Sequence, residues 1–176
     1  MKNFTSLNHI ERNKLITIVL KDDYEVAGFV LDHSENWILI QYNPADYILD
    51  GFVIIKTSEI KEMYRSEDEE FTESVIRLKN IPIGIDKKIP LNNAEEIITA
   101  LNELYGIFIF SDEPNESVFA GRLIAFEEDE IVYQFISTQA QWENEETLFP
   151  LEDITYIEFN SDYLLSLKLA SEKLYN

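Results

Sequence analysis

Two stretches of the chain carry the same pattern. Residues 25–42 read EVAGFVLDHSENWILIQY, and residues 118–135 read VFAGRLIAFEEDEIVYQF. In each stretch an Ala-Gly pair is followed, thirteen positions after the glycine, by a glutamine: Gly28 with Gln41, and Gly121 with Gln134. Apolar residues surround both glycines, and a glycine inside a strand permits a sharp bend. The copies lie 93 positions apart, and this self-similarity indicates a duplicated β-rich unit.

Further apolar runs extend both copies. The expected strands of the first copy are 15–20, 25–31, 37–42, 52–56 and 60–64. Those of the second copy are 107–110, 118–126, 131–137, 148–150 and 154–159. β-Branched and aromatic residues dominate these runs, and turn-forming residues separate them. Each copy is therefore expected to form a small barrel of five bent strands.

Helical spacing occurs in three other places. Ser66 and Glu69 form a capping-box pattern, although residues 73–79 also fit an extended strand. The segment 92–106 begins with two asparagines suited to capping, continues with helical apolar spacing and ends in glycine. Ser161 is suited to cap a C-terminal helix. The helices are expected to separate and finish the β units.

The predicted fold is mainly β with a few helices (α+β). It consists of two similar small five-stranded barrels from an internal duplication, joined by a helix-containing linker. The first unit is expected over 1–80 with a short N-terminal helix, the linker and its helix over 81–106, and the second unit with a C-terminal helix over 107–176.

Charge and composition exclude several classes of protein. The chain has 176 residues, with 14 Lys and Arg against 34 Asp and Glu, for a net charge of −20. A field of this sign repels polyanions, so a general nucleic-acid binder is not expected. The absence of cysteine excludes disulfides, thiolate metal sites and cysteine nucleophiles. No apolar run reaches the ~18 residues of a membrane span, and residues 1–13 are too polar for a signal peptide. A cytoplasmic protein is expected.

The first copy resembles the first Sm motif, in which a glycine bends the second strand and Asp and Asn shape the next turn. The matching positions are Gly28, Asp32, Asn36 and Leu39. In the second copy the matching positions are Gly121, Leu123 and Glu127. The chain is thus similar to a tandem Sm-like or SH3-like small β-barrel protein. The second Sm motif, with its Arg-Gly, is absent from both copies, and with it the residues that bind uridine-rich RNA in Sm proteins.

Acidic side chains concentrate in the second half of the chain. Residues 1–88 carry 11 basic and 16 acidic side chains, whereas residues 89–176 carry 3 and 18. Two interpretations stand: a solvated surface, or a docking face for a basic protein. For docking, an aromatic anchor among carboxylates is typical of a hot spot, although Trp142 can equally cover a barrel mouth. The candidate partner-binding residues are Trp142, Glu143, Glu145, Glu146, Glu127, Glu128, Asp129 and Glu130.

Catalytic and metal-binding patterns are sparse. The consecutive carboxylates of 127–130 would point to both faces of a strand and could not all reach one ion. Asp50 with Glu59 and Lys61 imitates the Asp…Glu-x-Lys pattern of metal-dependent nucleases, but a duplicated strand explains the triplet more simply. His9 and His33 are interpreted as ordinary surface residues. No phosphate-binding glycine loop or nucleophile elbow occurs. We expect neither an enzyme nor a cofactor or metal site.

The function expected from these features is non-catalytic protein binding. In charge and size the chain resembles an immunity or antitoxin protein of the bacterial kind, which blocks a basic, nucleic-acid-cleaving toxin. The expected partner is a basic protein, with no membrane and no nucleic acid bound, and the chain is expected to be a monomer or homodimer. The alternative is a divergent Sm-like RNA-binding or oligomeric scaffold protein.

Overall fold

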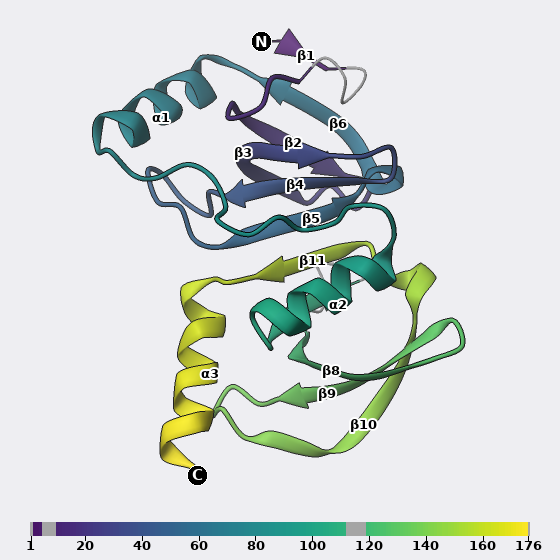
Figure 1. The fold of residues 1–176 in the computed structure, drawn as a ribbon. Helices are drawn as coiled ribbons and strands as arrows, with labels where there is room; N and C mark the ends of the chain where they lie inside the picture. The colour runs from purple at the N-terminus through teal and green to yellow at the C-terminus, as the bar shows by residue number, and fades with distance from the viewer. Residues whose placement is uncertain (1, 5–9, 112–118, 176) are drawn as a thin grey trace. The chain divides into compact units, whose positions relative to one another are not determined.

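The computed structural model describes residues 2–4, 10–111 and 119–175 (Figure 1). This part of the chain is mainly β with three α-helices, which confirms the predicted α+β class. It divides into two compact units, Met1–Lys88 and Ile89–Asn176, called unit 1 and unit 2 here. The helix assigned above to a linker therefore belongs to unit 2. None of the helices in the described ranges has the length and apolar character needed to cross a membrane.

Unit 1 is an antiparallel sheet with one helix. Its strands are β1 (Lys2–Asn3), β2 (Leu15–Leu20), β3 (Glu25–His33), β4 (Trp37–Tyr42), β5 (Phe52–Lys56) and β6 (Ile60–Arg65). They are arranged in the order β1-β6-β2-β3-β4-β5. A 3-10 turn, η2 (Thr57–Glu59), precedes β6, and α1 (Glu67–Leu78) follows it. The predicted strands of the first copy are confirmed to within two residues, because their apolar runs coincide with the buried core.

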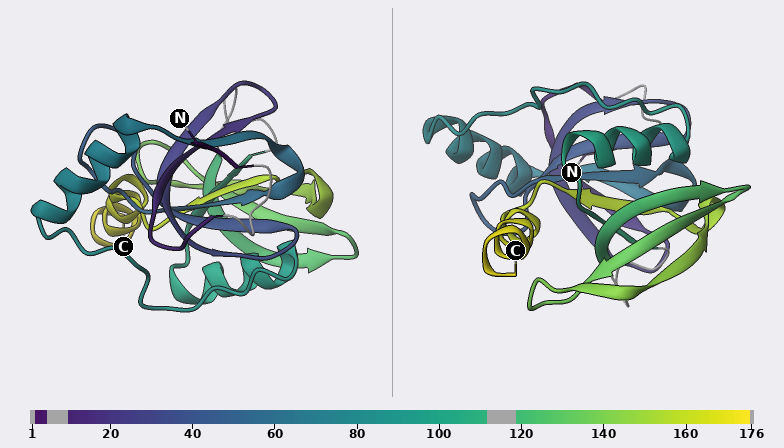
Figure 2. Two further views of the ribbon diagram at one scale, coloured as in Figure 1. Left: turned by 90° about the horizontal axis from the view of Figure 1, so that it is seen from above. Right: turned by 60° about the horizontal axis from the view of Figure 1, so that its bottom comes forward.

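Unit 2 repeats this succession after an initial helix. The elements are α2 (Ala94–Leu104), β7 (Phe108–Ser111), β8 (Phe119–Glu127), β9 (Glu130–Ile136), β10 (Trp142–Pro150), η3 (Leu151–Asp153), β11 (Tyr156–Phe159) and α3 (Asp162–Leu174). The strand order is β11-β7-β8-β9-β10. Helix α2 contacts β8 and η3 (Figure 2). Val118, expected to open the second strand, lies outside the described residues.

The two repeat glycines occupy equivalent places in the two units. A Cβ on Gly28 would lie 2.5 Å from the carbonyl oxygen of Gln41, and one on Gly121 would lie 2.3 Å from that of Gln134. A β-bulge begins two positions after each glycine, at Val30 in β3 and at Leu123 in β8. The glycine is therefore needed where the backbone of the next strand approaches most closely.

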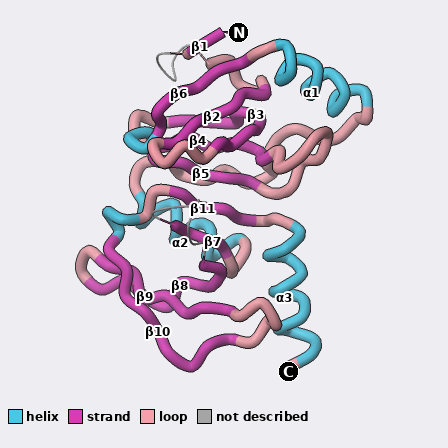
Figure 3. The backbone as a smooth tube through the Cα atoms, turned by 180° about the vertical axis from the view of Figure 1, so that it is seen from behind, coloured by secondary structure: helices cyan, strands magenta, loops and turns pink. Residues whose placement is uncertain are grey.

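The order of the five repeated strands is also the same in both units. In each, the last strand pairs with the first, the others follow in sequence, and a 3-10 turn precedes the last strand (Figure 3).

The expectation of closed barrels is wrong for the described residues. Neither set of strands closes on itself: the strand order of unit 2 ends at β10, whose strand pairing within the unit is with β9 alone. β10 carries several carboxylates and ends in Pro150, which has no N–H to donate. Like charges and proline are features that keep an edge strand from pairing further.

The helix signals are confirmed in part. Ser66 caps α1 in a full capping box with Glu69, and the helix continues to Leu78, so the extended alternative for 73–79 is wrong. Asn93 caps α2 through the backbone N–H of Glu96. Ser161 precedes α3, but its side chain makes no capping hydrogen bond. The expected N-terminal helix falls partly on residues 5–9, outside the described residues, and Lys2–Asn3 form a strand.

Two buried carboxylates attach α1 to the sheet of unit 1. Oε1 of Glu69 accepts a hydrogen bond of 2.8 Å from the Thr17 hydroxyl. Oε2 of Glu73 accepts the backbone N–H of Leu15 at 3.1 Å and lies 2.9 Å from Nη1 of Arg65. Burial raises the pKa of Glu73, but the Leu15 N–H and the neighbouring guanidinium groups outweigh burial and hold this pKa below its ordinary value. The pKa of Glu69 is lowered in the same sense, because hydrogen bonds from Ser66 and Thr17 outweigh its burial.

These lowered pKa values make the stability of unit 1 sensitive to acid. A carboxyl group with a lower pKa in the folded than in the unfolded state stabilises the fold fully above its unfolded value, near 4.5. That stabilisation is lost as the pH falls through the folded pKa. We therefore expect the melting temperature, measured from pH 7 to pH 3, to fall more steeply in the native chain than in Glu73→Gln. Parallel curves for the two proteins would contradict this assignment.

Candidate functional site

Strand β10 carries the acidic segment that the sequence singled out. The sequence predicted a loop before a short strand at 148–150, but β10 spans Trp142–Pro150. The pairing jumps from Trp142↔Ile136 to Glu146↔Gln134, so the intervening residues of β10 form a bulge. The Gln134 side-chain amide donates 2.6 Å to the backbone carbonyl of Glu143 and holds this bulge against β9. The acidic segment is thus a fixed edge of unit 2 and not a loop.

Trp142 lies at the beginning of this edge and is half-buried. The guanidinium carbon of Arg122 lies 4.3 Å from the centre of its ring system. The indole also packs against the buried cluster that includes Ile107, Ile136 and Leu164. One face of the indole is therefore already occupied by a cation of the chain itself.

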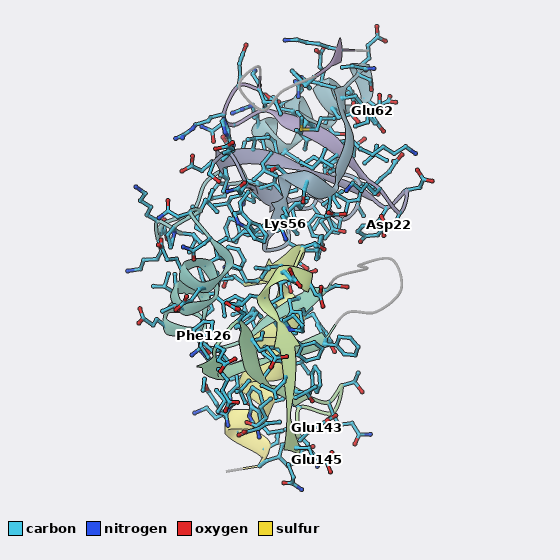
Figure 4. The ribbon with its side chains drawn as sticks, turned by 90° about the vertical axis from the view of Figure 1, so that its right-hand side faces the viewer. Asp22, Lys56, Glu62, Phe126, Glu143 and Glu145 are labelled. Carbon is cyan, nitrogen blue, oxygen red and sulfur yellow. The ribbon has the colours of Figure 1, made fainter. Side chains whose placement is uncertain are left out.

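The carboxylates that follow Trp142 face solvent. Glu143, Glu145 and Glu146 are exposed, and none of them belongs to an ion pair between described residues. Figure 4 shows Glu143 and Glu145 next to each other, away from Phe126 near the β8–β9 turn. The edge therefore presents uncompensated negative charge.

The second predicted cluster lies at the other end of the same strands. Glu127 and Glu130 are directly paired across the β8–β9 hairpin, with Glu128 and Asp129 in its turn. Glu130 pairs with Pro150, and Ile136 pairs with Trp142, at opposite ends of the β9–β10 ladder. Along β9, Glu130 lies roughly 20 Å from Ile136 and roughly 13 Å from Gln134, the residue opposite Glu146. The structure therefore separates the eight predicted residues into two groups: the β10 edge group (Trp142, Glu143, Glu145 and Glu146) and the turn group (Glu127, Glu128, Asp129 and Glu130).

An aromatic pocket of about 360 Å³ adjoins Glu143. Its walls include Phe119 and Phe135, whose ring centres lie 5.2 Å apart, and Tyr163 from α3. Phe119 and Tyr163 are 40% and 45% exposed, although both are large aromatic side chains. None of these residues is among the site residues predicted from the sequence. The high aromatic content of β8 and β9 was the available signal, but the approach of Tyr163 depends on tertiary structure.

Aromatic packing holds the walls of this pocket in place. The Tyr133 hydroxyl is buried and donates 2.6 Å to the carbonyl of Phe108. Its ring lies 5.5 Å from that of Phe135, centre to centre. The ring of Phe149 in β10 lies 5.8 Å from that of Phe135 on another side. Rings packed on each other in tilted and edge-to-face geometry leave the pocket little freedom to collapse.

The nuclease-like triplet is not assembled. Oε1 of Glu59 lies 3.4 Å from Nζ of Lys21, whereas Lys61 pairs with Asp23. Within the described ranges, no three His, Asp or Glu side chains are grouped so that they could hold a metal ion. His33 is the last residue of β3, and His9 lies outside the described residues.

The site thus combines a rigid aromatic pocket with an exposed acidic strand edge. Such a surface is suited to recognising positively charged side chains, since carboxylates attract them and aromatic faces accept them. Comparison of the chain with protein-family models, with curated proteins and with solved structures gives no match.

Proposed function

We propose that this chain is a non-catalytic protein-binding module that docks a basic partner on the β10 edge of unit 2. The observation that carries the proposal is the aromatic pocket beside Glu143, on a strand edge whose carboxylates have no ion-pair partner among the described residues. A lysine or arginine side chain of the partner enters the pocket and meets both aromatic faces and a carboxylate. Trp142 packs against the buried cluster of unit 2 and so holds the beginning of this edge in place.

The most concrete form of the proposal is an immunity or antitoxin-type inhibitor. A partner that binds nucleic acid has a basic cleft, and carboxylates spaced along one strand can take the place of phosphates there. Complementary charge speeds association and selects the partner, while the aromatic pocket supplies the desolvated centre where most binding energy arises. Inhibition then consists of steric blockage of the cleft.

Charge reversal at the edge tests the proposal. The partner is first captured from the native host with the tagged chain, once at low salt and once at ~0.5 M salt. The higher salt concentration screens exposed charges. Its affinity for the purified chain is then measured by calorimetry. We expect Glu143→Lys/Glu145→Lys/Glu146→Lys to weaken binding by about a hundredfold or more.

The turn group provides a matched control. Glu127→Lys/Glu128→Lys/Glu130→Lys changes the net charge by the same amount at the opposite end of β9. This variant should slow association but leave the dissociation rate nearly unchanged. If the two triple variants weaken binding equally, the β10 edge is not the docking site.

A second candidate is a divergent Sm-like RNA-binding or oligomeric scaffold protein. It is favoured by the repeated strand order and by the glycine and bulge positions common to both units. We infer from these features that the units arose by internal duplication of one small β module. Retention of single-stranded RNA at ~0.15 M salt supports this candidate, and no retention even at low salt excludes its RNA-binding form.

A further inference from the structure

A second and larger groove lies in unit 2. Its volume is about 660 Å³, and its walls come from α3, from the segments that precede β7 and β10, and from one residue each of β8 and β10. Arg122, Trp142, Lys168 and Tyr175 line it, together with one carboxylate, that of Glu172. The volume is within the range of ordinary small-molecule sites.

The groove gathers most of the positive charge of the second half of the chain. Residues 89–176 contain three basic side chains, Arg122, Lys168 and Lys173, against 18 acidic ones. Two of the three line this groove. With acidic residues in such excess, a cation on this unit would be expected to find a carboxylate partner. Neither Arg122 nor Lys168 belongs to an ion pair between described residues.

Both cations are held in place by neutral groups. Nε and Nη2 of Arg122 donate to the side-chain oxygen of Gln134 at 2.9 and 2.7 Å, and the guanidinium lies over Trp142. Nζ of Lys168 donates 2.6 Å to the backbone carbonyl of Tyr105, just beyond the end of α2. These bonds fix each side chain but leave its charge uncompensated. The Nη1 edge of Arg122 and further N–H donors of Lys168 remain for another acceptor.

We propose that this groove binds a small organic oxyanion, a carboxylate or a phosphate, between Arg122 and Lys168. Preorganised guanidinium and ammonium donors form the stronger, charge-assisted kind of hydrogen bond with such groups. The indole of Trp142 and the ring of Tyr175 offer apolar walls for the rest of the ligand. The surrounding negative field excludes polyanions, so the ligand carries few charges. This site shares Trp142 with the β10 edge group, but its cations do not belong to that group and it does not depend on the proposed docking function.

The test uses three probes: inorganic phosphate, benzoate and adenosine monophosphate. Each is titrated into the full chain at low ionic strength, with calorimetry and tryptophan emission as readouts. We expect saturable binding of at least one probe, with a change in emission because Trp142 lines the groove. Binding of benzoate alone identifies a carboxylate ligand, and binding of phosphate or the nucleotide alone identifies a phosphate ligand; both results support the oxyanion site. Absence of saturable binding by all three below ~10 mM overturns it.

Helix α3 offers a matched pair of variants. Lys168→Gln removes the charge but keeps an N–H donor for the Tyr105 carbonyl, and it should weaken binding by about tenfold or more. Lys173→Gln makes the same charge change on an exposed residue that does not line the groove, and it should leave the affinity unchanged. Arg122→Gln is a second groove variant should Lys168→Gln not fold. Equal weakening by Lys168→Gln and Lys173→Gln would show a general charge effect and overturn the site.

Discussion

Replacing Gly121 by alanine should destabilise unit 2 by about 2–3 kcal/mol. The added Cβ would lie 2.3 Å from the Gln134 carbonyl oxygen and 2.5 Å from Cε1 of Tyr133. Neither neighbour can move freely, because the first is backbone in the β8–β9 ladder and the second belongs to a fully buried ring. The two strands must therefore separate or Tyr133 must leave its packing. Chemical denaturation followed by circular dichroism measures the loss.

The same substitution in unit 1 is informative by comparison. At Gly28 the nearest atoms are the Gln41 carbonyl oxygen at 2.5 Å and the side-chain end of Ile40 at 2.9 Å. A terminal methyl yields more readily than a buried ring, so Gly28→Ala should cost less than Gly121→Ala. Ala125→Ser adds one atom at an exposed position of β8 and should change stability by less than about 0.5 kcal/mol. A Gly121→Ala protein as stable as this control would refute the close approach.

Glu73→Ala should destabilise unit 1 by about 3 kcal/mol. The carboxylate is 6% exposed, accepts hydrogen bonds from the Leu15 backbone N–H and from Arg77, and forms an ion pair with Arg65. Removing it leaves a backbone donor without a partner and a guanidinium, 13% exposed, without its nearer and buried counter-charge. Thermal and urea unfolding measure the change.

Glu70 supplies the control within the same helix. Its carboxylate is 65% exposed and lies 3.7 Å from Nε of Arg65. Exposed ion pairs contribute less than about 1 kcal/mol, so Glu70→Ala should leave stability nearly unchanged. Similar losses of stability for Glu70→Ala and Glu73→Ala would show that burial of the Glu73 carboxylate makes no special contribution to the stability of unit 1.

The strands of unit 1 could be predicted because burial and sequence pattern coincide there. The run Leu15–Leu20 is apolar throughout and every residue of it is buried. In β10, by contrast, the five residues that follow Trp142 are all charged or polar, and nothing in their pattern distinguishes an edge strand from a loop. An edge strand solvated along one side does not need apolar alternation.

The sequence predicted which acidic residues belong to the candidate site, but not how the site is arranged in space. The acidic residues and Trp142 were identified, but their division into two groups follows from the register of the β8–β9 and β9–β10 pairs. The aromatic pocket joins Phe119 of β8 to Tyr163 of α3, residues that only the folded chain brings together. Sequence spacing also gave no sign that Arg122 and Trp142 would stack.

The distance between the acidic turn and the acidic edge bears on valency. Groups separated by roughly 13 to 20 Å of extended strand are too far apart to share a single arginine or lysine of a partner, and energetic effects at such separations usually add. The chain therefore offers two independent acidic groups on the three adjacent strands β8, β9 and β10. A partner that docks on the β10 edge therefore leaves the turn group for a second basic molecule.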